Sequence, residues 1–235
     1  IGVYGEGSKC FATQAPNYWA LTKMMWNPER DTSKLMDEFW VSCYGPVAEE
    51  MKRFFETYSR ALDENWSKRK KIINTTGIAY VNLINSWNIL FPPEVIEEAE
   101  KHLSEAEKKV PPGEYADRVA FHRFGHEYTK LMTELLNCYQ KLSELGLKMD
   151  SFSTGVTETR EDPEEKKKIL MRAYQLGEKR EDMLLAHRDW AAMDEGLYAF
   201  TNDNKLRQWH ATVKKELGIE KPTRLTKESL KQLQK

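Results

Sequence analysis

The stretch that decides the fold is EYADRVAFHRFGHEYTKLMTELLNCYQKLSEL, from Glu114 to Leu145. Apolar residues recur in it at alternating intervals of four and three, the spacing of one face of a long α-helix in a bundle. These residues are Phe124, Tyr128, Leu131, Leu135, Cys138, Leu142 and Leu145. Gly146 follows, and glycine commonly ends a helix. The pattern therefore predicts a helix over 114–145 and other helices packed around it.

Capping residues and prolines divide the rest of the chain into further predicted helices. Asp162 and Pro163, for example, fit the cap and first turn of a helix. We expect helices over 17–26, from Asp31 or Thr32 to Tyr44, from Pro46 to about residue 73, over 94–110, from Pro163 to about Leu176, over 180–193, from about Asp203 and from about Thr226. The segment 72–91 fits both helix and irregular structure. The sequence thus predicts an all-α protein, a bundle of roughly eight helices.

The composition excludes several classes of function. The 235 residues include 36 Lys and Arg against 37 Asp and Glu, so no basic surplus favours nucleic-acid binding. No apolar run approaches the roughly 20 residues that a membrane span needs. The three cysteines, Cys10, Cys43 and Cys138, are far apart and odd in number, which excludes a CxxC motif and a disulfide framework. No cofactor is predicted.

The N-terminus differs from the helical remainder. Ile1 to Tyr4 form a short apolar run that predicts a strand, and Gly5-Glu6-Gly7-Ser8 follows as a turn with one acidic residue. Together with the helix over 17–26 this makes a single βα unit, which has no sheet to join. We therefore expect a preceding part of the protein to lie upstream. Glu6 is the most site-like residue, because strand ends carry binding groups in α/β barrels; the alternative is an ordinary turn carboxylate.

Two histidines of the long predicted helix are four residues apart, a spacing that metal sites use. His122 and His126 have the spacing of a shared metal pair, with Glu127 beside them. In HExxH proteases the acid lies between the two histidines, whereas Glu127 follows both of them. At about 100° per residue the pair lies opposite the apolar seam, so a polar helix face is favoured and no metal is predicted.

Several stretches resemble a known family. They are Val3 to Glu6, PNYWALTKMMWNP at 16–28, LMDEF at 35–39, YGPVAEEM at 44–51 and FPPEVIEEAE at 91–100. They resemble the C-terminal part of a bacterial family of unknown function whose members look like TIM-barrel glycoside hydrolases with a helical region after the last strand. The resemblance implies that residues 1–30 are the remnant of the last barrel βα unit and that 31–235 form a C-terminal helical domain.

A looser resemblance links the N-terminus to the last βα unit of β-hexosaminidases. Glu6 matches the acid that lines their sugar subsite, while Tyr4 stands where they have tryptophan, which puts the sugar specificity in doubt. Tyr4, Glu6 and Trp19 are thus the substrate-binding candidates. The catalytic acid and nucleophile of such enzymes lie on earlier strands, so no catalytic residue is assigned to this chain.

We therefore expect the helical region of a glycoside-hydrolase-like protein that acts on or binds carbohydrate and is not catalytically competent alone. The partners expected are carbohydrate through the parent barrel and a second copy through helical faces, with no nucleic acid and no membrane. The resemblance also implies a bacterial protein outside the cytoplasm.

The alternative is an independent α-helical interaction or carbohydrate-binding module. That alternative predicts Val3 and Tyr4 packed in the helical core, whereas a barrel remnant predicts Val3, Tyr4 and Trp19 exposed, disordered or paired with another strand.

Overall fold

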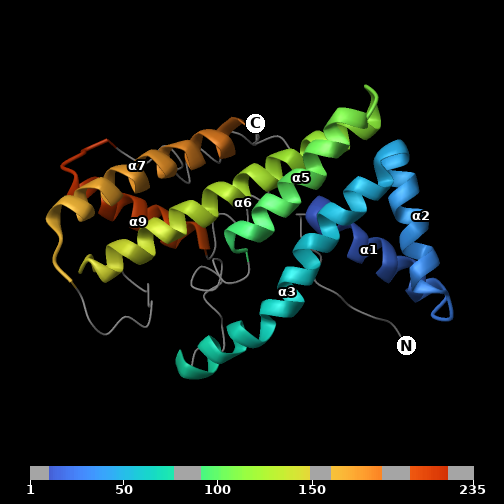
Figure 1. Cartoon of the computed structure of the whole chain (residues 1–235), viewed down its shortest axis with the longest axis horizontal. Coiled ribbons are helices and arrows are strands. Elements are labelled where there is room, and N and C mark those ends of the chain that lie inside the picture. Colours follow the sequence, from blue (N-terminus) through green and yellow to red (C-terminus); the bar gives the residue numbers. More distant parts are fainter. Residues whose placement is uncertain (1–10, 77–90, 149–159, 187–201, 222–235) are drawn as a thin grey trace. The chain divides into compact units, whose positions relative to one another are not determined.

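The structure, a computed structural model, describes residues 11–76, 91–148, 160–186 and 202–221, and all regular structure in these ranges is helical (Figure 1). The all-α prediction is confirmed for them. The chain divides into two compact units. The described residues of the first unit lie within Ile1–Ala61 and Pro93–Glu127, and those of the second within Leu62–Pro92, Tyr128–Arg188 and Glu195–Lys235.

The first unit begins with helices α1 (Phe11–Trp26) and α2 (Thr32–Tyr44). Asp31 caps α2, because its side chain accepts from the backbone N–H groups of Ser33 and Lys34. Gly45 ends α2 with a φ of 49°, and a Cβ there would lie 2.6 Å from the Tyr115 ring, so this turn requires glycine. A short 3-10 turn η1 (Gly45–Val47) then leads into α3 (Ala48–Thr76).

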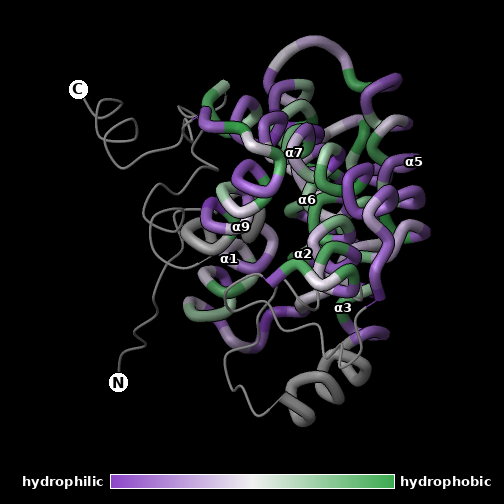
Figure 2. Tube along the Cα trace, turned by 90° about the vertical axis from the view of Figure 1, so that its left-hand side faces the viewer, coloured by the Kyte–Doolittle hydropathy of each residue, from purple (hydrophilic) through white to green (hydrophobic). Residues whose placement is uncertain are grey.

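Helix α5 (Pro93–Lys109) and the start of α6 (Glu114–Glu144) complete the first unit. Helix α5 buries one stripe: Ile96, Ala99, Leu103 and Ala106. Its charged residues appear as purple segments in Figure 2. The core of the unit is aromatic and comprises Phe39, Trp40, Tyr44, Val47, Met51, Phe54, Ala99, Leu103, Ala106 and Val119. Helices α2, α3, α5 and α6 therefore share one apolar core.

The second unit packs α7 (Pro163–Ala186) and α9 (Asn202–Glu216) against the later part of α6. Its core contains most of the predicted α6 seam: Leu131, Leu135, Cys138, Leu142 and Leu145 are buried. Trp209 of α9 is fully buried and its ring meets Tyr139 edge-on, with centroids 5.6 Å apart. Gly146 ends α6 with a φ of 78°, as the sequence predicted.

The structure corrects three predicted boundaries. Helix α1 begins at Phe11, so Pro16 lies inside it and not in its first turn. Residues 72–76 are helical, as the end of α3. Helix α7 continues through Gly177 to Ala186, where two helices were expected. The predicted N-terminal strand, the tail helix and residues 77–90 lie outside the described residues. The predicted domain boundary after residue 30 stays a prediction.

Candidate functional site

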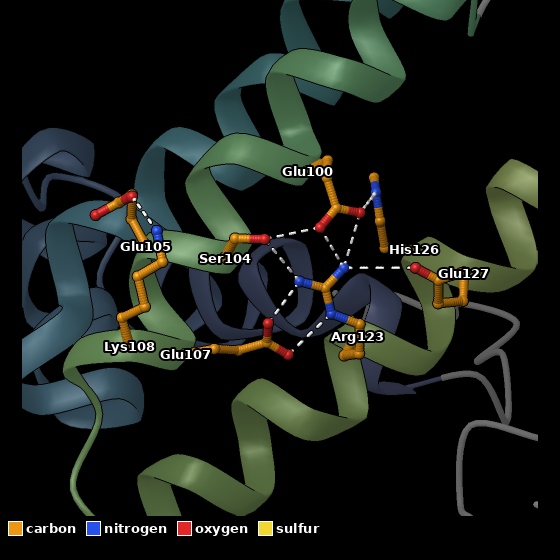
Figure 3. Close-up of polar contacts among 8 residues, drawn as sticks. All are labelled: Glu100, Ser104, Glu105, Glu107, Lys108, Arg123, His126 and Glu127. Carbon is orange, nitrogen blue, oxygen red and sulfur yellow. Dashed lines mark hydrogen bonds and ion pairs between the residues drawn. The ribbon is translucent and has the colours of Figure 1, made fainter.

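A polar cluster between α5 and α6 gathers around the guanidinium of Arg123 (Figure 3). Arg123 Nε and Nη2 donate to the two carboxylate oxygens of Glu107 at 2.8 and 2.6 Å. Its Nη1 lies 2.8 and 2.9 Å from the two oxygens of Glu100 and 3.5 Å from Glu127. Ser104 accepts from Arg123 and donates to Glu100. The guanidinium thus forms a fork-like pair with Glu107 and a further ion pair with Glu100 on the same helix.

His126 joins this cluster to α3. Its ring is almost fully buried, with Nε2 3.0 Å from Glu100 and Nδ1 2.6 Å from the Tyr58 hydroxyl. A carboxylate only accepts, so Nε2 carries the proton given to Glu100, and Nδ1 can accept from Tyr58. Burial, and next the charge of Glu100, raise the pKa of Tyr58, which keeps its hydroxyl protonated. The result is a chain from Tyr58 through His126 to Glu100 and Arg123.

The cluster joins helices; its geometry does not resemble that of a catalytic pair. A glycosidase needs one protonated and one ionised carboxyl group on either side of a bond. Here the carboxylates of Glu100 and Glu107 both pair with the same guanidinium, so the two acids share one charged partner and do not have contrasting surroundings. Hydrogen bonds and charges from these two acids raise the pKa of Arg123. The arrangement therefore holds α5 against α6 within the first unit.

Replacing Arg123 with methionine should lower the free energy of unfolding by about 2 kcal/mol. This lies between the small cost of losing an exposed ion pair and the larger cost of breaking a buried one. The Arg123 side chain is 22% exposed, and its loss leaves Glu100 and Glu107 without their counter-charge. The matched control is Lys108→Met, which removes an exposed pair with Glu105 on the same helix (Figure 3). Urea denaturation should show a loss for Arg123→Met alone; equal midpoints would contradict the structural role.

The second buried histidine of α6, His122, lies among aromatic rings. Its Nε2 is 2.7 Å from the Tyr44 hydroxyl, and the rings of Phe54, Phe55 and Phe121 surround it. Burial lowers its pKa to about 4, so the imidazole is neutral at physiological pH. Burial also raises the pKa of Tyr44, so its hydroxyl can donate to Nε2. This histidine is a buried core residue.

A third histidine, His210 of α9, forms a separate polar group in the second unit. Its Nε2 lies 3.0 Å from Glu178 of α7, whose carboxylate is also 2.9 Å from the Lys214 ammonium. The His210 ring stacks on Tyr174 and lies directly over Gly177, where a Cβ would be 2.2 Å from Nδ1. Glycine at this position therefore allows α7 and α9 to approach closely.

The substrate-binding candidates are only partly described. Tyr4 and Glu6 lie outside the described residues. Trp19 is half-buried on α1, with its ring centroid 5.9 Å from that of Phe39 and the Lys23 ammonium 4.6 Å from its centre. Its indole N–H is buried and has no hydrogen-bond partner among the described residues. Trp19 thus packs against the first core and is not a freely exposed platform.

The weak metal candidates do not converge. His122 and His126 are buried and bonded to different tyrosines, and Glu127 pairs with Arg123. Among the described residues, no three His, Cys, Asp or Glu side chains are placed to hold one ion. The expected polar helix face is also wrong at these positions. Both histidines face the first core, because α3 and the end of α2 cover the face of α6 opposite the seam.

Sequence reasoning missed the Arg123 cluster, although a signal was present. Glu100, Ser104 and Glu107 recur on one face of α5 at intervals of four and three. Next to a long helix with a central arginine, that spacing indicates an interhelical ion pair. Only the packing of α5 on α6 identifies Arg123 as the partner.

Comparison with known proteins gives one family match. Residues 2–56 match a family described as Domain of unknown function (DUF4838). This segment contains α1, α2, η1 and the first residues of α3. No curated protein and no solved structure matches the chain. None of the helices described here is long and apolar enough to cross a membrane.

Proposed function

We propose that this chain is the C-terminal helical region of a bacterial, extracytoplasmic glycoside-hydrolase-like protein, and that it supports a carbohydrate-binding barrel without catalysing hydrolysis itself. Residues 2–56 match a family of unknown function, and this segment includes several of the stretches on which the resemblance rests. The match therefore supports membership of a family of unknown function, which is one part of the resemblance. In the proposal, residues 1–30 are the last βα unit of the barrel, and Glu6 accepts a hydrogen bond from a sugar hydroxyl.

The observation that carries the proposal is that α1 has apolar residues on two faces. Trp19 packs on Phe39 of α2. Leu21, Met25 and Trp26 are instead 50%, 55% and 93% exposed. A helix that is apolar around most of its circumference is typical of one enclosed between two layers. An eighth barrel helix, with the barrel on one side and α2 on the other, would have this character.

The test is an activity assay on the purified 235-residue chain. We expect no hydrolysis of aryl glycosides by the chain, and no difference between it and Glu6→Ala. A chain that hydrolyses these substrates, with the activity lost in Glu6→Ala, would overturn the proposal. Retained activity in Glu6→Ala would also overturn it, because the catalytic groups would then lie within the helical region.

The packing of Trp19 favours a second candidate, an independent α-helical interaction or carbohydrate-binding module. Half-burial of Trp19 against Phe39 is what a self-contained helical fold requires. Calorimetric titration with soluble oligosaccharides separates the two candidates. Binding by the chain alone, lost in Trp26→Ala but kept in Trp40→Phe, would support a module with an exposed indole platform. Absence of binding supports the barrel-dependent role.

A further inference from the structure

Helix α1 has one face that is largely apolar, uncharged and exposed, and we call this face the outer stripe. It comprises Leu21, Thr22, Met25 and Trp26. Intervals of three and four residues place these side chains on the same side of the helix. The Thr22 hydroxyl donates to the backbone carbonyls of Tyr18 and Trp19, so it already has acceptors within α1. The outer stripe thus presents mainly apolar surface to water.

Helix α1 also carries very little charge. Its 16 residues include a single charged side chain, Lys23, which is not part of the outer stripe. The ammonium of Lys23 lies 4.6 Å from the centre of the Trp19 ring, and that ring packs on Phe39 of α2. On α5, by contrast, the exposed positions after Pro93 are all charged, and burying them in a contact would cost their hydration. The outer stripe can be buried without that cost.

The absence of charge on the outer stripe matches one kind of partner, a second copy of the same surface. In a two-fold symmetric contact the same patch of both chains meets, so each charge on the patch would face a like charge. Like charges placed together across an interface weaken association. An uncharged apolar patch is therefore the kind of surface that is complementary to itself. Trp26 adds a large side chain of the type that dominates binding energy at interfaces.

We propose that two copies of this chain associate through their outer stripes, about a two-fold axis, into a weak homodimer. Trp26, which is 93% exposed, is the anchor of the contact. Its indole offers on the order of 200 Å² of surface. A standard stable interface buries about 800 Å² from each partner, more than four side chains of one helix supply. We therefore expect a reversible dimer that forms as the concentration rises, and not an obligate one.

The dimer goes beyond the proposed function and does not depend on it. It uses the face of α1 that the proposed barrel would cover, so the two contacts exclude one another. The two proposals also fail separately. A monomeric chain would overturn the dimer and leave the support of a barrel standing, whereas hydrolysis of aryl glycosides by the chain would overturn only the proposed function.

Sedimentation of the full 235-residue chain at a series of micromolar concentrations tests the dimer. The average mass should rise from that of one copy toward that of two as the concentration increases. Added sodium chloride should not dissociate the dimer, because salt screens charges and not apolar contacts. A chain that remains monomeric throughout the series, or that grows past two copies, would overturn the proposal.

Charged variants locate the contact on the outer stripe. Met25→Glu should weaken the dimer at least tenfold, since two-fold symmetry brings the two new carboxylates together, and Met25→Lys should do the same. An equal mixture of these two variants should associate more strongly than either alone, because opposite charges then meet. Met171→Glu, the same change at an exposed methionine of α7, is the matched control and should leave the dimer unchanged. Equal weakening at positions 25 and 171, or no recovery in the mixture, would overturn the proposal.

Discussion

Substituting Gly177 with alanine is expected to destabilise the second unit by about 3 kcal/mol, at the upper end of what overpacking costs. The added Cβ would lie 2.2 and 2.3 Å from Nδ1 and Cε1 of His210, which is far inside van der Waals contact. Both residues are buried, so neither the ring nor the helix can move outward without opening the contact between α7 and α9. Urea denaturation of the purified variant measures the loss.

Gly125→Ala provides the matched control, since Gly125 also lies inside a helix but has no atoms near the position of its missing Cβ. Alanine there should stabilise the protein by up to about 1 kcal/mol, the difference in helix propensity. In a His210→Ala background the clash at position 177 is removed. Gly177→Ala should then become neutral or stabilising, a coupling that a double-mutant cycle detects. Similar stabilities for the two glycine variants would contradict the close approach of α9.

The second large effect is a loss of stability in mild acid, caused by His122. Its pKa is about 4 in the folded protein, against 6.5 for an unperturbed imidazole. Between these values the unfolded chain binds the proton and the folded protein does not, so stability falls as the pH falls. The contribution is fully present above pH 6.5 and is lost progressively toward pH 4. The pKa difference corresponds to roughly 3 kcal/mol.

His122→Gln isolates this contribution from other titrating groups. Glutamine does not titrate and can still hydrogen-bond to the Tyr44 hydroxyl. The pKa of Glu98 is lowered by its hydrogen bond with Arg60 and that of His210 by burial, but these groups are the same in both proteins. Free energies of unfolding from urea curves at several pH values should therefore fall more steeply for the wild type than for His122→Gln. Parallel curves would show that His122 is protonated or solvated in the folded protein.

The sequence predicts helix positions well where local chemistry determines them. Asp31, one of the two residues expected to cap α2, does so, and Asp162 caps α7 as expected, since an acid at the N-cap acts within one turn. Gly146 likewise ends α6 through its own positive φ. The predicted break between two helices near Gly177 is wrong, because this glycine is determined by a contact with another helix and not by local chemistry. That glycine is required by a ring on another helix, and no feature of its neighbours in sequence shows this.

The candidate site illustrates a second limit of the sequence. The sequence predicts one apolar seam along the whole of α6, with His122 and His126 on the polar side of the helix. The buried residues of α6 change between the two units: Val119, His122 and His126 face the core of the first unit, whereas Leu131 and Leu135 belong to the core of the second. A helical wheel averaged over the entire segment conceals such a change.

The exposure of Trp26 has a spectroscopic consequence. Among the tryptophans whose side chains are described, Trp40 and Trp209 are buried and Trp19 is half-buried, so Trp26 is the indole most open to water. Its fluorescence should be red-shifted and readily quenched by iodide. Because Trp26 stands at the C-terminal end of α1, next in sequence to the exposed Met25, any protein layer or ligand that covers this end of the helix would shift the emission to the blue and protect it from quenching. The chain thus carries its own optical reporter for the occupancy of that surface.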